Sequence, residues 1–102
     1  MAVTEFNIQG NAWNNVATGA SGLSNTIDLH GRYQIALIGS VNGATTLTIE
    51  ATLDQINWYA TNERIFLVGS GDFHKTFVLP VPFLRIRSSL NITATVSVCA
   101  TG

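Results

Sequence analysis

The side chains that could perform acid–base or metal chemistry are few and scattered along the chain. His30 and His74 each stand beside turn residues, and neither belongs to a metal-binding spacing such as His-x-Glu or Cys-x-x-Cys. Asp28 lies two residues before His30, so the two share a strand face, which would allow a hydrogen bond between them and nothing more specific. We therefore expect structural or solvated histidines, no metal and no cofactor.

The cysteine and the carboxylates offer no better catalytic pattern. Cys99 is the only cysteine, so no intrachain disulfide can form, and no basic residue stands within a few positions to activate its thiol. The carboxylates contain no Asp-x-Asp-x-Asp run for calcium. Two of them could converge in the fold as glycosidase carboxylates do, which the sequence does not show. We predict that the protein is not an enzyme.

The arginines are more informative. Along 83–88, alternation places Arg85 and Arg87 on one strand face with Phe83, and Leu84 on the other. Two arginines on one face can bridge an acidic partner or a cross-strand carboxylate such as Glu50. The simpler interpretation is that both arginines are solvated and protect a sheet edge from pairing with another chain. The alternatives are contact with a sugar, a phosphate or another subunit.

The elements that position these residues are strands. Residues 46–53 and 92–100 alternate strictly between apolar and polar side chains, many of them β-branched, as half-buried antiparallel strands do. No window of ten residues has a comparable helical period. Further strands are expected near residues 3–8, 25–29, 33–38, 58–60 with 65–68, 73–79 and 83–88. These patterns predict an all-β fold: an antiparallel two-sheet β-sandwich, jelly-roll-like, of seven to eight strands.

Turn residues separate these strands within a single domain, residues 1–102. Asn42-Gly43 suits the positive φ angles of a tight hairpin, and Pro80 and Pro82 indicate a strand break or a sheet edge. Residues 9–24 are rich in Asn, Gly, Ala and Ser, with Trp13 among them. They predict a long polar loop pinned by its own tryptophan or, alternatively, an arm that reaches a neighbouring subunit.

Composition excludes several function classes. The 102 residues are 46% hydrophobic and only 11% charged, with net charge −1. Disorder is excluded, five Lys+Arg against six Asp+Glu disfavour nucleic acid, and no apolar run is long enough to cross a membrane. The first residues lack the pattern of a secretory signal. Typical domains carry about 25% charged residues. A surface this poor in charge is cheap to desolvate, so we expect other proteins to cover it.

The nine aromatic residues exceed what a core of this size needs. Tyr33 and Phe77 are the core candidates. Trp58 and Tyr59 are neighbours and face opposite sides, so one of them leaves the core. Outward aromatics on a weakly charged surface favour a protein interface over a sugar-stacking site. The predicted interface residues are Phe6, Trp13, Trp58, Tyr59, Phe83, Arg85 and Arg87.

The segment Thr48-Ile-Glu-Ala-Thr-Leu-Asp-Gln-Ile-Asn-Trp-Tyr59, followed by Phe83-Leu-Arg-Ile-Arg87, resembles small β-sandwich modules of tailed-bacteriophage virions. In those modules an Asp-containing turn closes a hairpin, the Trp packs over the sheet and the later strand lies beside it. The resemblance covers about half the chain, roughly 45–100. Gln55 stands where such modules more often have Gly.

Among these modules the chain is most similar to a small head decoration (cement) protein. The resemblance implies a structural virion protein on the capsid surface, made in the host cytoplasm. It would form a homotrimer and bind the major capsid protein at subunit junctions, with no nucleic-acid or membrane partner. The alternative is a tail- or fibre-associated glycan-binding module, with Trp13, Trp58 or Tyr59 stacking on sugar.

Overall fold

The computed structural model describes residues 8–102, of which the side chains are described from residue 10, and this part of the chain contains eight strands and no helix. The strands are β1 (Ile8–Ala17), β2 (Ile27–Asp28), β3 (Gln34–Val41), β4 (Thr45–Thr52), β5 (Tyr59–Leu67), β6 (Gly71–Val78), β7 (Phe83–Ser88) and β8 (Thr93–Thr101). The two runs of strictest alternation became β4 and β8, while residues 58–60 and 65–68 belong to one continuous strand, β5. The prediction of an all-β fold is confirmed.

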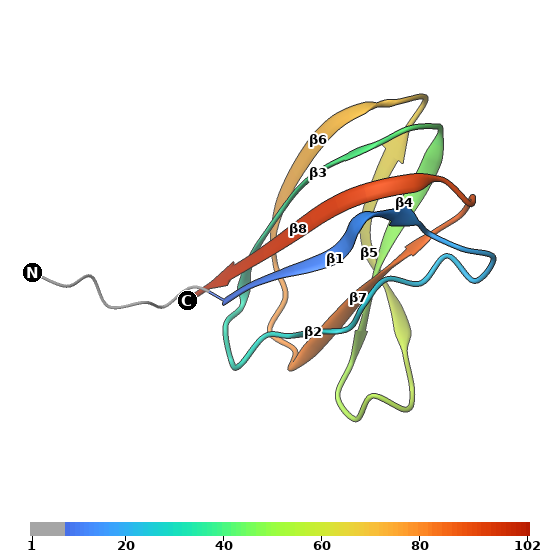
Figure 1. Ribbon diagram of the computed structural model, residues 1–102. Coiled ribbons are helices and arrows are strands. Elements are labelled where there is room, and N and C mark those ends of the chain that lie inside the picture. Colours follow the sequence, from blue (N-terminus) through green and yellow to red (C-terminus); the bar gives the residue numbers. More distant parts are fainter. Residues whose placement is uncertain (1–7) are drawn as a thin grey trace, which may run out of the picture.

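The strands form two antiparallel four-stranded sheets that face each other (Figure 1). Sheet A has the order β1-β8-β3-β6 and sheet B the order β2-β7-β4-β5. The first strand therefore pairs with the last, the second with the seventh, the third with the sixth and the fourth with the fifth. This is the winding of a jelly roll, in which one long antiparallel hairpin folds over to make both sheets. The predicted jelly-roll-like sandwich is present.

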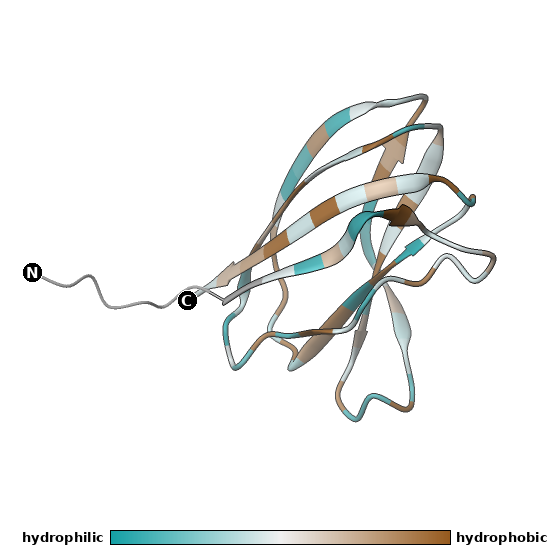
Figure 2. Cartoon of the chain, in the orientation of Figure 1, coloured by the Kyte–Doolittle hydropathy of each residue, from teal (hydrophilic) through white to brown (hydrophobic). Residues whose placement is uncertain are grey.

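The core lies between the sheets and is built by alternation. Apolar bands follow one another at every second position along β8 (Figure 2). Phe77 packs partly buried against this core as predicted, but Tyr33 is 42% exposed because it lies at the end of the sandwich, beyond the first residue of β3. The buried apolar side chains are Ala12, Trp13, Ile27, Leu29, Ile35, Leu37, Val41, Leu47, Ile49, Leu84, Ile86, Ala94, Val96, Val98 and Ala100.

The prediction of a polar loop or arm over residues 9–24 is wrong for its first half. Most of it is β1, an edge strand that pairs with β8 along its whole length. Two bulges interrupt the pairing, one of them between Asn11 and Trp13. A bulge breaks the period of two, so the sequence shows no alternation, and it turns Trp13 into the core with only 3% of its surface exposed.

The second half of this segment lies against its own molecule. The backbone N–H of Ser24 donates to the carbonyl of Ile86, and the N–H of Ser88 donates to the carbonyl of Gly22. Residues 18–26 thus line the β7 side of sheet B beside the short strand β2. These backbone hydrogen bonds attach the segment to strand β7 of its own molecule.

Two of the connections that cross between the sheets carry the turn residues singled out in the sequence. Asn42-Gly43 joins β3 of sheet A to β4 of sheet B, so the predicted tight hairpin is wrong. This connection is instead joined to the start of β8, because Asn42 donates its N–H to the Thr93 carbonyl and accepts the Thr93 N–H on Oδ1. Pro80 and Pro82 lie between β6 and β7, as expected for a strand break.

Candidate functional site

The residues predicted to form an interface do not share one surface. Phe6 lies outside the described residues, as does most of the strand expected at 3–8. Trp13 is in the core and unavailable to a partner. The side chains of Trp58, Phe83, Arg85 and Arg87 lie on or over the outer face of sheet B, and Tyr59 is 67% exposed at the start of the edge strand β5.

Glu50 is the centre of a charged cluster on the outer face of sheet B. It lies on β4 directly opposite Arg85 of β7, and Arg87 follows two residues along β7. Arg85 Nε donates to Glu50 Oε1 and Arg87 Nε donates to Oε2, both at 2.8 Å. The sequence-based expectation that these arginines can bridge Glu50 is confirmed. Burial raises the pKa of Glu50, but the hydrogen bonds and charges of Arg87 and Arg85 outweigh burial and hold the pKa below its usual value.

Trp58 completes this cluster. The guanidinium carbon of Arg85 lies 4.1 Å from the centroid of the Trp58 ring, which is a cation–π contact. Arg85 is therefore held from two sides, by a carboxylate and by an aromatic face, and its side chain is only 17% exposed. Because the guanidinium occupies one face of the ring, Trp58 has at most one face left for a sugar.

The β4–β5 hairpin projects beyond the body of the sandwich (Figure 1), and Asp54 fixes its tip. The backbone N–H groups of Asn57 and Ile56 both donate to Asp54 Oδ1 at 2.9 Å. These two bonds lower the pKa of Asp54 from 3.8 to about 2. Gln55 adopts a φ of 62° in the middle of the turn, a conformation that glycine adopts more readily. The ordered tip presents Leu53 and Ile56 to solvent.

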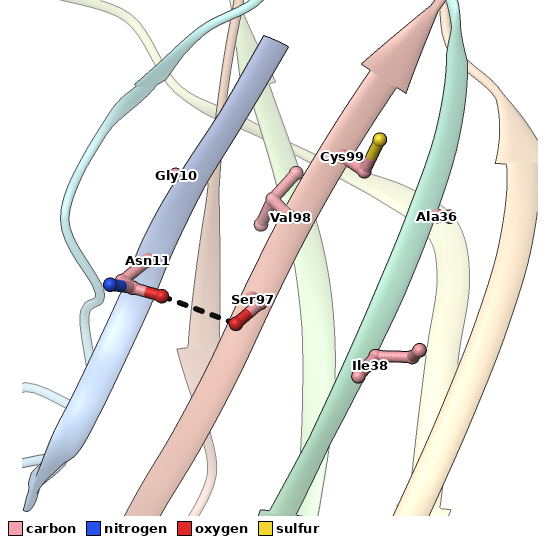
Figure 3. A pocket seen from close by; sticks show the side chains of 7 residues that line it. All are labelled: Gly10, Asn11, Ala36, Ile38, Ser97, Val98 and Cys99. Atoms are coloured by element: carbon pink, nitrogen blue, oxygen red, sulfur yellow. Dashed lines mark hydrogen bonds between the residues drawn. The ribbon is translucent and has the colours of Figure 1, made fainter. Parts of the chain in front are cut away.

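The outer face of sheet A has a different character. Its outward side chains on the central strands β8 and β3 carry no charge, and the only outward acidic, basic or histidine side chains on the described part of sheet A are Asp72 and His74 at the β6 edge. A shallow groove runs between β1, β8 and β3, and Figure 3 shows Cys99 and Ile38 along it. Asn11 accepts a hydrogen bond from Ser97 at one side of this groove. Cys99 alternates with the buried Val98 and points away from the core.

Sites for metal or acid–base chemistry are sparse by comparison. Among residues 8–102, no group of three or more His, Cys, Asp or Glu side chains could hold a metal ion. His30 donates its backbone N–H to Asp28 Oδ1 at 3.0 Å, while its ring nitrogen stays 3.7 Å from Oδ2. The hydrogen bond between these two residues is therefore made by the backbone N–H of His30 and not by its ring. The same part of the chain holds no helix that could span a membrane.

Two parts of these surfaces were not visible in the sequence. Arg64 and Thr48 join Arg87 on the outer face of sheet B only because of the strand register. Alternation along 60–66 could have placed Arg64 outward, but not beside Arg87. The low charge content of the sequence predicted a surface that other proteins cover, but it did not say where on the molecule that surface lies. The strand order gathers the uncharged outward side chains on sheet A.

No family model and no curated protein matches the chain.

Proposed function

We propose that this protein is a non-enzymatic structural virion protein, a head decoration protein that assembles with copies of itself and covers junctions between subunits of the major capsid protein. The observation that carries the proposal is the outer face of sheet A, whose central strands β8 and β3 have no charged outward side chain. The resemblance of 48–59 and 83–87 to phage virion modules gives the proposal its biological setting.

The physical argument begins with desolvation. A partner that covers β8 and β3 removes water from hydroxyl, amide, thiol and aliphatic groups, with no strongly hydrated charge to strip. Ile38 and Val78 are 64% and 63% exposed on this face, so they have apolar area left to bury. The shallow groove on this face can receive a protruding surface of complementary shape.

The function follows from many such contacts acting together. A decoration protein needs no catalytic group, because it stabilises a shell by bridging several neighbouring subunits in a fixed geometry. A homotrimer would place three copies of each binding surface around one axis. Jelly rolls occur in viral capsid proteins, lectins and cupins, so the fold is compatible with this function without selecting it.

A glycan-binding module, the alternative expected from the sequence, is less well supported. Trp13 is buried, and Arg85 covers one face of Trp58. Of the three tryptophan and tyrosine side chains proposed to stack on sugar, only Tyr59 is freely exposed.

Light scattering of the purified protein, combined with co-sedimentation on undecorated capsid shells, tests the proposal. The wild type should be a trimer that sediments with the shells. Ile38→Glu places a charge on the outer face of sheet A and should give monomers. Ser70→Glu adds the same charge in the exposed β5–β6 connection and should leave the trimer intact. A wild-type protein that is monomeric at all concentrations and ignores the shells would overturn the proposal.

A further inference from the structure

The outer face of sheet B carries an excess of positive charge that the Glu50 cluster does not use. The outward positions of β7, β4 and β5 include Arg64, Arg85 and Arg87 but only one carboxylate, Glu50. One of the three positive charges is compensated, and two remain. Glu63 of β5 alternates to the opposite face of the sheet and pairs with Lys75, and the next outward carboxylate of sheet B, Asp28, lies on the other edge strand, β2.

Two of these arginines flank one hydroxyl group. Thr48 of β4 is directly opposite Arg64 of β5 on one side and Arg87 of β7 on the other. Residues in such a row point to the same face, and neighbouring strands are about 4.8 Å apart, so the two arginine Cα atoms are separated by about 10 Å. The row offers two guanidinium groups and a hydroxyl donor to one anionic group placed above Thr48.

The row is partly preorganised. Arg87 Nε is fixed by Glu50, and one terminal nitrogen of Arg87 makes a long 3.4 Å contact with the carbonyl of Ser21. Arg64 is exposed and takes part in none of the ion pairs found within residues 8–102. An anion that binds here therefore meets one arginine already held in place, which lowers the entropy lost on binding.

We infer that the Arg64–Thr48–Arg87 row is a docking site for carboxylate side chains of an acidic protein surface. The inference rests on the proposed function for the identity of that partner, the capsid, and adds the chemistry by which the partner is recognised. Under this assignment sheet A mediates contact between copies, and sheet B faces the partner.

Charge and surroundings favour a protein over a nucleic acid. Nucleic-acid affinity depends on several phosphate contacts, and here two uncompensated charges belong to a chain of net charge −1. Phe66, which is 74% exposed, and Phe83 lie on the same face. Arginine with exposed aromatic side chains is the composition of protein-binding hot spots.

Nuclear magnetic resonance of the full ¹⁵N-labelled chain tests the site, with arginine side-chain signals as the readout. The probe is the peptide acetyl-Asp-Glu-Asp-Glu-amide, compared with acetyl-Asn-Gln-Asn-Gln-amide and with a short single-stranded oligothymidylate. We expect the acidic peptide alone to shift the Nε–Hε signals of Arg64 and Arg87, with a Kd that rises with salt.

Matched variants separate the site from general charge. Arg64→Gln should weaken binding of the acidic peptide roughly fivefold, and Thr48→Val should weaken it less while keeping the side chain's shape. Arg32→Gln removes the same charge near the β2–β3 connection and should change Kd by less than about twofold. Equal losses in the two arginine variants, tighter binding of the oligothymidylate, or no shift at Arg64 and Arg87 would each overturn the inference.

The titration is repeated with Ile38→Glu. The oligomeric state of that variant reports on the proposed function, while its peptide binding reports on the sheet B site. Failure of one can therefore be told from failure of the other.

Discussion

The outer faces of the two sheets follow the same rule of alternation and yet present opposite chemistry. Sheet A exposes Thr, Ser, Gln, Ala, Ile and Cys across its central strands, with Asp72 and His74 only at its β6 edge. Sheet B exposes three arginines around a buried glutamate and a tryptophan. The inner faces of both sheets are buried in the core, so only the outer faces are available to partners. The difference in chemistry between the outer faces therefore decides which partner each sheet can bind.

The two faces should respond to a partner in different ways. Removing water from an uncharged face costs little free energy, and its affinity comes from the apolar area buried and from shape complementarity with the partner. A charged face gains less net free energy, because desolvation opposes the Coulomb attraction, but it selects the partner and sets the rate of encounter. One molecule with both faces can therefore bind its own copies through one and a different, acidic partner through the other.

The largest effect is expected at Gly22, which supports the border of the charged face. Gly22 has a φ of +70°, and an added Cβ would collide with the carbonyl oxygen of Ser88. Gly22→Ala should lower the free energy of unfolding by about 3 kcal/mol. Gly19→Ala is the control, because Gly19 has a similar φ of +84° but open space around it, and should cost only about 1 kcal/mol. Urea unfolding measures both; equal losses would show that the collision is relieved cheaply.

The next effect belongs to Glu50. Glu50→Gln leaves Arg85 and Arg87 without their carboxylate in a partly buried site, and should destabilise the fold by about 2 kcal/mol. Glu63→Gln removes the partner of Lys75 in a more exposed pair between β5 and β6, and should cost no more than about 1 kcal/mol. Thermal unfolding of both variants decides whether the cluster on sheet B is structural, and a harmless Glu50→Gln would argue that it is not.

Acid should weaken the sheet B side of the molecule. The pKa values of Glu50 and Asp54 are lower in the folded protein than their usual values, so the folded state binds fewer protons than the unfolded state. Their contribution is complete above about pH 5. It is lost as the pH falls through the folded pKa values, that of Asp54 being about 2. Urea midpoints between pH 6 and pH 2 should fall for the wild type and less steeply for Glu50→Gln; a midpoint that rises on acidification contradicts this.

The smallest effect is expected at the tip of the β4–β5 hairpin. Gln55 holds a φ of 62°, which costs a residue with a Cβ more than it costs glycine. Gln55→Gly should raise the free energy of unfolding by about 0.5 kcal/mol, since the relief of strain is offset by the greater freedom of glycine in the unfolded chain. A calorimetric melting temperature measures this change. A lower melting temperature would mean that the Asp54 network tolerates Gln55 without strain.

The sequence predicted what local alternation encodes. It identified the strands around 46–53 and 92–100, the outward pair Arg85 and Arg87, and the possibility of their contact with Glu50. The sequence did not predict features that depend on a break in this alternation or on which residues of neighbouring strands pair. The bulges in β1 hid a strand and its buried Trp13.

Long-range pairing explains the remaining errors. Asn42-Gly43 has the residues of a hairpin turn, but β3 and β4 belong to different sheets, which no local pattern reveals. The Arg64–Thr48–Arg87 row joins the β4–β5 hairpin to β7, a strand that comes later in the chain. A single sequence contains the side chains of such a row without the pairing that aligns them.

Cys99 allows the most direct test of the claim that fellow subunits cover sheet A. It is the only cysteine in the chain, and it lies half-buried in the groove on that face. Its alkylation rate should fall as the wild-type protein is concentrated, and should stay high at every concentration for Ile38→Glu. Alkylation in denaturant provides the intrinsic rate. A wild-type rate that is independent of concentration and equal to that of Ile38→Glu would mean that this face stays open to solvent, which contradicts the account.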